Sequence, residues 1–87
     1  MQKTEGPTGR LITVDREESV AAAARMLSRH NVGALPVTSG GRLVGILTDR
    51  DIAVRCVAAN CDPNITRVRT IMQAEAITSI GAEKTES

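Results

Sequence analysis

The amino-acid sequence predicts a small α+β domain: a single β-α-β-β-α unit whose small mixed sheet packs on two helices, followed by the first strand of a second copy. Two observations carry this prediction. Short runs rich in β-branched residues alternate with two segments in which apolar residues recur at helical spacing. The chain has 87 residues and lacks Phe, Tyr and Trp, so it can form one domain with a modest core.

Charge and apolar content exclude several classes of protein. The 11 Lys and Arg residues nearly balance the 10 Asp and Glu residues, which argues against a nucleic-acid binder that relies on bulk positive charge. No apolar run reaches the roughly 20 residues that span a bilayer, and the N-terminus lacks a secretory signal. We therefore expect a cytoplasmic protein that binds neither nucleic acid nor a membrane. A basic nucleic-acid surface remains a weaker alternative, built on the dispersed Arg10, Arg42, Arg67 and Arg69.

The chain divides into three expected parts. Residues 1–10 hold glycines and a proline among polar residues, which predicts a mobile leader. Residues 11–80 contain every segment with a helix or strand period and form the domain. Residues 81–87 are polar and predict a frayed tail.

A strand, a helix and a second strand are expected first. The β-branched run 11–14 predicts the strand. The helix begins at Ser19, whose hydroxyl can cap the first free amides, and it ends near Asn31. In the second strand, 34–37, Pro36 has no amide hydrogen and so predicts a sheet edge or an interruption of the ladder.

A hairpin turn at 39–41 then leads into a third strand, 43–47, whose unbroken apolar run predicts burial on both faces. The second helix is expected from Thr48 to about Ala59. Its apolar stripe is expected to comprise Ile52, Ala53, Cys56 and Val57.

The C-terminal part of the domain resembles its beginning. Residues 67–72 predict a short helix that Thr66 can cap, and residues 76–80 return to strand character. The Ile-Thr pair at 77–78 repeats the pair at 12–13, as the first strand of a second copy would. Repeat units of this kind seldom bury their apolar face alone, so we expect a homodimer.

The two cysteines predict neither a metal site nor a disulfide framework. Cys56 and Cys61 are too few and too awkwardly spaced for either, and His30 is the one histidine. We expect reduced thiols. An enzyme that uses a cysteine nucleophile with His30 as base is a poor alternative, because Cys56 falls on an apolar stripe and Cys61 has no evident base nearby. We therefore assign no catalytic or metal-binding residue.

The segment where the third strand ends and the second helix begins carries the most chemical information. Gly45 lets a ligand or a neighbouring strand approach the sheet, and Thr48 presents a hydroxyl beside free helix amides. The Asp51 carboxylate can accept two hydrogen bonds from a vicinal diol such as ribose. Arg50 and Arg55 can pair with phosphate oxygens.

A purely structural interpretation explains the same residues. The spacing Thr-x-x-Asp is that of a capping box, in which Thr48 and Asp51 satisfy backbone amides at a helix start. Asp49 and Asp51 also suit the positive end of a helix dipole without any ligand. The spacing alone favours the cap.

The segments 32–37 (VGALPV) and 41–52 (GRLVGILTDRDI) resemble the two central motifs of the CBS domain, a family named after cystathionine β-synthase and usually found in tandem pairs called Bateman modules. Residues 68–72 (VRTIM) resemble the short helix that precedes each repeat of that family. The resemblance spans roughly residues 11–80.

The resemblance implies a nucleotide site. The family pattern is Gly, apolar, any residue, Thr or Ser, two of any kind and Asp, which Gly45, Ile46, Thr48 and Asp51 match. By resemblance, Asp51 would hold the ribose hydroxyls, Thr48 the phosphate, and Ile46 would lie against the adenine. The pocket would be completed, largely through backbone atoms, by Thr13, Ala34, Leu35 and Pro36. Typical ligands of the family are AMP, ADP, ATP or S-adenosylmethionine.

Two departures from the family shape the functional hypothesis. Residues 1–10 do not show the expected short helix, and the second repeat stops after its first strand. Because the family's sites form between two repeats, the second repeat is expected from another chain. The leading hypothesis is a regulatory module that binds an adenine nucleotide as a homodimer and requires no cofactor. The alternative is a ligand-free dimerisation module, with the flat, alanine-rich helix face at 21–24 as the contact.

Overall fold

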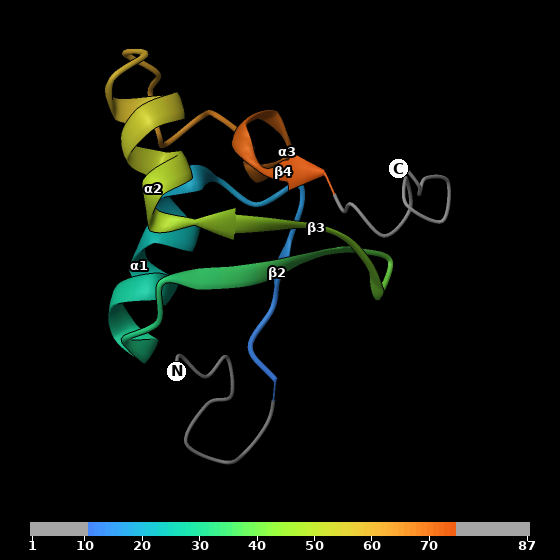
Figure 1. Cartoon of the computed structure of the whole chain (residues 1–87). Coiled ribbons are helices and arrows are strands. Elements are labelled where there is room, and N and C mark those ends of the chain that lie inside the picture. The colour runs from blue at the N-terminus through green and yellow to red at the C-terminus, as the bar shows by residue number, and fades with distance from the viewer. Residues whose placement is uncertain (1–10, 75–87) are drawn as a thin grey trace, which may run out of the picture.

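A computed structural model describes residues 11–74 of the chain (Figure 1). The expected leader at 1–10, strand at 76–80 and tail at 81–87 lie outside the described residues. The elements, in chain order, are β1 (Val14–Asp15), α1 (Val20–His30), β2 (Ala34–Ser39), β3 (Arg42–Thr48), α2 (Asp49–Ile52), η1 (Ala53–Val57), α3 (Val68–Ile71) and β4 (Gln73–Ala74). Among the described elements, no helix has the length and apolar character needed to cross a membrane.

The four strands form one mixed sheet in the order β1-β2-β3-β4. β1 runs parallel to β2, whereas the β2–β3 and β3–β4 pairs are antiparallel. α1 and α2 pack on each other and on the central hairpin of β2 and β3, and Figure 1 shows them along one side of it. The predicted α+β class is confirmed.

The core consists of small and medium aliphatic side chains from every layer. Its buried apolar residues are Val14, Val20, Ala23, Leu27, Leu35, Val37, Leu47, Cys56, Val68 and Ile71. Burial of one Val or Leu side chain stabilises a fold by roughly 2 kcal/mol, so a core of this size leaves a modest margin over chain entropy.

The predicted ends of α1 are confirmed. The Ala22 amide donates to the Ser19 hydroxyl oxygen at 3.1 Å, which satisfies one of the free amides of the first turn. At the other end, Asn31 adopts the left-handed conformation with φ of 54° and closes the helix.

The segments 16–21 and 63–69 cap each other. Four backbone hydrogen bonds join them: Val20 N to Thr66 O, Ala21 N to Pro63 O, Val68 N to Glu18 O and Arg69 N to Arg16 O, at 2.8 to 3.0 Å. The prediction that the Thr66 side chain caps α3 is wrong. Arg67 occupies the N-cap position without a side-chain bond, because carbonyls of the distant loop take the first amides of α3.

The prediction for Pro36 is half right. β2 lies between β1 and β3, so it is not an edge strand. However, β1 pairs with Val37 and Thr38, which leaves Pro36 outside that ladder. The absence of a proline amide therefore costs the β1–β2 pairing nothing.

β3 is buried on one face, not on both as its apolar run predicts. Leu47 is fully buried under the helices, whereas Leu43 and Ile46 remain 44% and 40% exposed. The reason is that α1 and α2 cover the same face of the hairpin. The predicted turn is present, with positive φ at Gly40 and Gly41.

The second helix changes geometry halfway along. α2 continues directly into η1, a π-helical stretch that closes with the Ala58 amide donating to the Ala53 carbonyl at 2.9 Å. The extra residue per turn shifts the helical register, so the predicted apolar stripe is wrong at its end. Cys56 is fully buried, but Val57 is 70% exposed.

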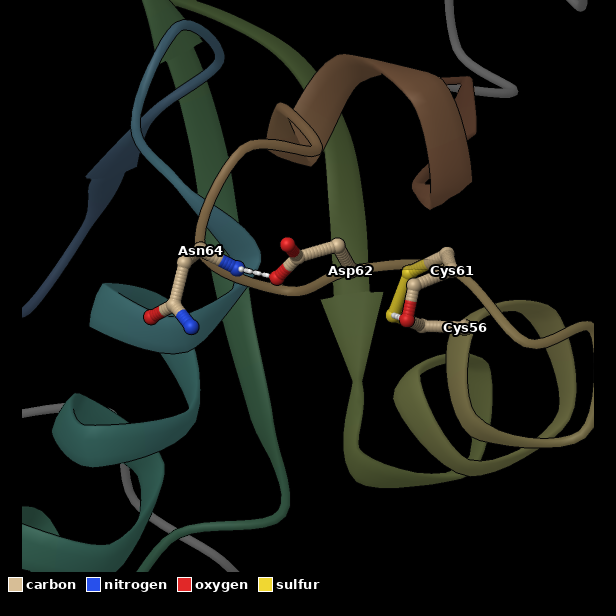
Figure 2. Close-up of a disulfide and its surroundings, with 4 residues drawn as sticks. All are labelled: Cys56, Cys61, Asp62 and Asn64. Carbon is tan, nitrogen blue, oxygen red and sulfur yellow. Dashed lines mark hydrogen bonds between the residues drawn. A yellow bond between two sulfur atoms is a disulfide. The ribbon is translucent and has the colours of Figure 1, made fainter.

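The expectation of reduced thiols is also wrong, because Cys56 and Cys61 form a disulfide (Figure 2). Asn60 adopts a left-handed conformation with φ of 64°, and the Cys61 amide donates to the Cys56 carbonyl at 2.8 Å. This turn returns Cys61 over the last helical turn, with 4.7 Å between the two Cα atoms, a usual separation for a bridge. After the bridge, Asp62 accepts a hydrogen bond from the Asn64 amide.

β4 was not expected at its observed place. Its two residues pair with Gly45 and Ile46 of β3. A Cβ atom at Gly45 would lie 2.5 Å from the Gln73 carbonyl oxygen and 3.0 Å from the Met72 sulfur. The missing side chain at Gly45 therefore serves the close approach of a neighbouring strand, one of the two roles predicted for it.

Reduction of the disulfide should lower the free energy of unfolding by about 2 kcal/mol, because the bridge restricts the unfolded chain over a short loop. Urea unfolding with and without a phosphine reductant measures the difference. The Cys61→Ala variant is the control and should be insensitive to the reductant. Two titratable thiols per chain in protein prepared without reductant would contradict the prediction.

Gly45→Ala should destabilise the fold by about 1–3 kcal/mol, since the new methyl group displaces the backbone of β4. The matched control is Gly33→Ala, whose Cβ would meet its nearest neighbour, Asp49 Oδ2, at an ordinary 3.5 Å. Chemical denaturation of both variants measures the difference. Equal stability of the two variants would show that β4 does not pack as described.

Candidate functional site

The β2–β3 pairing brings together most residues predicted for the site. Opposite partners in the register include Ala34 with Thr48, Leu35 with Leu47, and Pro36 with Ile46. Leu35 is fully buried, so it can contribute backbone atoms to a ligand but not its side chain. Ile46 offers an exposed apolar surface next to the half-buried Pro36.

The predicted capping box is present at the end of β3. The Asp51 amide donates to Thr48 Oγ1 at 3.0 Å, and the Thr48 amide donates to Asp51 Oδ2 at 2.9 Å. Asp51 is 5% exposed. It is the one buried charged residue in the part of the chain that the structure describes. These reciprocal bonds hold the carboxylate in one position. An ionised carboxylate fixed in this way can accept a strong hydrogen bond from a further donor.

Gln73 of β4 supplies that further donor. Its side-chain amide nitrogen lies 3.1 Å from Asp51 Oδ1 and 3.2 Å from Oδ2. The sequence analysis missed this residue, because 22 positions separate it from Asp51 and no local pattern relates them. Gly45 could have indicated that another segment packs here, because a residue without a side chain lets a neighbouring strand come close.

The charges around this turn are arranged to favour an acidic helix start. Asp49 and Asp51 both lie in the first turn of α2, where they interact favourably with the helix dipole. Arg50 and Arg55 are exposed, so each guanidinium is free to reach a bound anion at the surface. The site therefore combines one fixed acceptor with an exposed cationic side chain, that of Arg50, in the same helical turn.

Thr13 directly precedes Val14, which pairs with Val37, so it lies at the level of Pro36 in the sheet. It borders a cavity of about 280 Å³ between β1 and α1, together with Arg25, Met26 and Arg29 among others. A second cavity, of about 300 Å³, lies between α1 and α2. Neither of these two cavities is lined by any of the motif residues Gly45, Ile46, Thr48 and Asp51.

The described residues offer no alternative metal or thiol site. No cluster of three or more His, Cys, Asp and Glu side chains occurs within residues 11–74. Cys56 and Cys61 are bonded to each other, so neither carries a free thiolate in this state. The arrangement at Asp51 can accept hydrogen bonds from a diol or an amide.

Known proteins with similar sequences share this segment. A family model described as "CBS domain" matches residues 7–58, more than half of the chain. CBS domain-containing protein YhcV of Bacillus subtilis is 41% identical over 70 residues, which cover 80% of this chain and 49% of that protein. Hypoxic response protein 1 of Mycobacterium tuberculosis is 46% identical over 52 residues, 59% of this chain and 36% of that protein. The chain spans half or less of the length of these curated relatives.

A solved structure shows the same fold. A cystathionine beta-synthase domain protein fused to a Zn-ribbon-like domain superposes with a TM-score of 0.73 and 32% identity, over 76% of this chain and 94% of that chain. The sheet order, the capped turn after β3 and these similarities lead to one conclusion. The chain belongs to the CBS-domain family.

Proposed function

We propose that the chain is a regulatory module that binds an adenine nucleotide between two paired copies. CBS-domain proteins are generally regulatory modules, and the family model that matches this chain is that of the CBS domain. The observation that carries the ligand proposal is the Asp51 carboxylate, buried, fixed by the Thr48 amide and aimed at a polar partner from another element. A carboxylate held in this way can accept both hydroxyls of a ribose.

The neighbouring groups suit the rest of a nucleotide. The exposed Ile46 surface and the ring of Pro36 form an apolar platform for a purine. Arg50 is exposed one position before Asp51 and can neutralise a phosphate. The candidate ligands AMP, ADP, ATP and S-adenosylmethionine share the adenosine that this arrangement reads.

A second copy is part of the proposal because one chain builds only one wall of the pocket. Neither of the two described cavities is lined by Gly45, Ile46, Thr48 or Asp51, and Leu43 and Ile46 leave an apolar face of β3 uncovered. Pairing of two such faces would bury this surface and enclose the ligand. A nucleotide that binds the paired arrangement better than the separated one shifts the equilibrium toward pairing, which is how it would signal.

The alternative function, ligand-free dimerisation, is favoured by a different observation. The capping box is complete, and Gln73 already satisfies the Asp51 carboxylate. In this alternative Thr48 and Asp51 serve the fold alone, and the protein pairs whether or not a nucleotide is present.

Asp51→Ala separates the two functions. Loss of the cap should cost about 1 kcal/mol of stability in either case. If the nucleotide proposal holds, millimolar AMP, ATP or S-adenosylmethionine raises the melting temperature of the wild type and leaves that of Asp51→Ala unchanged. The matched control, Asp49→Ala, removes an exposed carboxylate from the same helical turn and should retain the ligand-induced shift.

Calorimetric titration of the wild type gives a second readout of the same prediction. Heat of binding that saturates at one ligand per chain, or at one ligand per dimer, supports the nucleotide function. Absence of both heat and thermal shift for all of these ligands would reject it in favour of ligand-free dimerisation.

The solution mass should be twice that of the chain at micromolar concentration, because the exposed face of β3 needs a cover. Sedimentation equilibrium over a hundredfold range of protein concentration measures it. A monomer with cooperative unfolding across this range would contradict the pairing on which both functions depend.

A further inference from the structure

We propose that Gln73 is an internal competitor for the ligand: its side-chain amide occupies the Asp51 carboxylate in the free protein and must withdraw when a ribose diol binds. This inference rests on the proposed function and adds to it a residue that sets the affinity for the diol. The supporting geometry is the amide nitrogen at 3.1 Å and 3.2 Å from the two carboxylate oxygens.

The carboxylate cannot serve both partners at once. Asp51 is 5% exposed, and Oδ2 already accepts the Thr48 amide. Of the roughly four lone pairs of the carboxylate, the Gln73 amide takes one on each oxygen, so a single one is left, on Oδ1, whereas a diol needs two. A cis-diol would donate to the same pair of oxygens, so it competes directly with the glutamine amide.

Gln73 can leave this position without unfolding the domain. The residue is exposed, and among residues 11–74 its side chain has no hydrogen bond other than the two to Asp51. Its backbone is held separately, by pairing opposite Ile46 in the sheet. Rotation of the side chain therefore frees the carboxylate while water solvates the released amide, and the strand can stay in place.

The competition acts only on ligands that carry the diol. A ligand with two vicinal hydroxyls has to replace both contacts of the amide, whereas a ligand that lacks them leaves the amide on Asp51. Gln73 would thus weaken the binding of diol ligands alone. Binding would also release Gln73 from Asp51, which couples the state of the site to β4.

The test compares AMP with 2′,3′-dideoxy-AMP on the wild type, Gln73→Ala and Gln73→Asn, by calorimetric titration of the full chain. Both variants lose the reach to Asp51 and should bind AMP roughly ten- to a hundredfold more tightly, the effect of removing competing hydrogen bonding to a charged group. Their affinity for the dideoxy nucleotide should not increase. Thr70→Ala, which removes an exposed side chain from the preceding helix, is the control and should bind like the wild type.

The outcomes distinguish this inference from the proposed function. Equal AMP affinities for wild type and both Gln73 variants would overturn the competition and leave nucleotide binding intact. A gain for AMP and the dideoxy nucleotide alike, or a gain also in Thr70→Ala, would overturn it too, since the effect would not act through the diol. If no protein binds AMP, the proposed function fails and the inference fails with it.

Discussion

The pairing of β2 with β3 is the constraint on which the rest of the molecule depends. The register sets Leu35 opposite Leu47 beneath the helices, and it sets Ala34 opposite Thr48 at the end of the hairpin where α2 begins. A slip of one residue would turn Leu35 and Leu47 toward solvent, so the hydrophobic pattern holds the register firmly. The same pairing therefore decides both the core and the position of Asp51.

The sequence predicted what local chemistry determines. The Ser19 cap, the left-handed Asn31 and the Thr48–Asp51 box each depend on side chains within a few positions of one another, and the structure contains all three. The strand order inside the hairpin followed from the glycine turn. The Gly45–Asp51 motif was also recognisable, because its residues are close together in the sequence. The segment that packs against it was not, because that segment is distant in the sequence.

The errors share a physical cause, which is that tertiary contacts override local pattern. Thr66 does not cap α3 because the amides of Val68 and Arg69 donate to carbonyls of the segment 16–21, at least 50 positions away along the chain. Val57 is exposed because a π-helical turn rotates it off the stripe, and no sequence period announces such a turn. The Cys56–Cys61 bridge depends on one left-handed residue, Asn60, and Gln73 reaches Asp51 through the sheet.

The hydrogen bonds between the segments 16–21 and 63–69 place the end of the folded domain beyond the end of the stretch that the family model matches. The family model matches residues 7–58, a stretch that excludes the carbonyls of Pro63 and Thr66. A fragment cut at that boundary would leave the opening amides of α1 without acceptors and would strip Val68 and Ile71 from the core. The smallest piece able to fold is therefore longer than the stretch that the family model matches, and excision for transplantation into another protein has to run through α3.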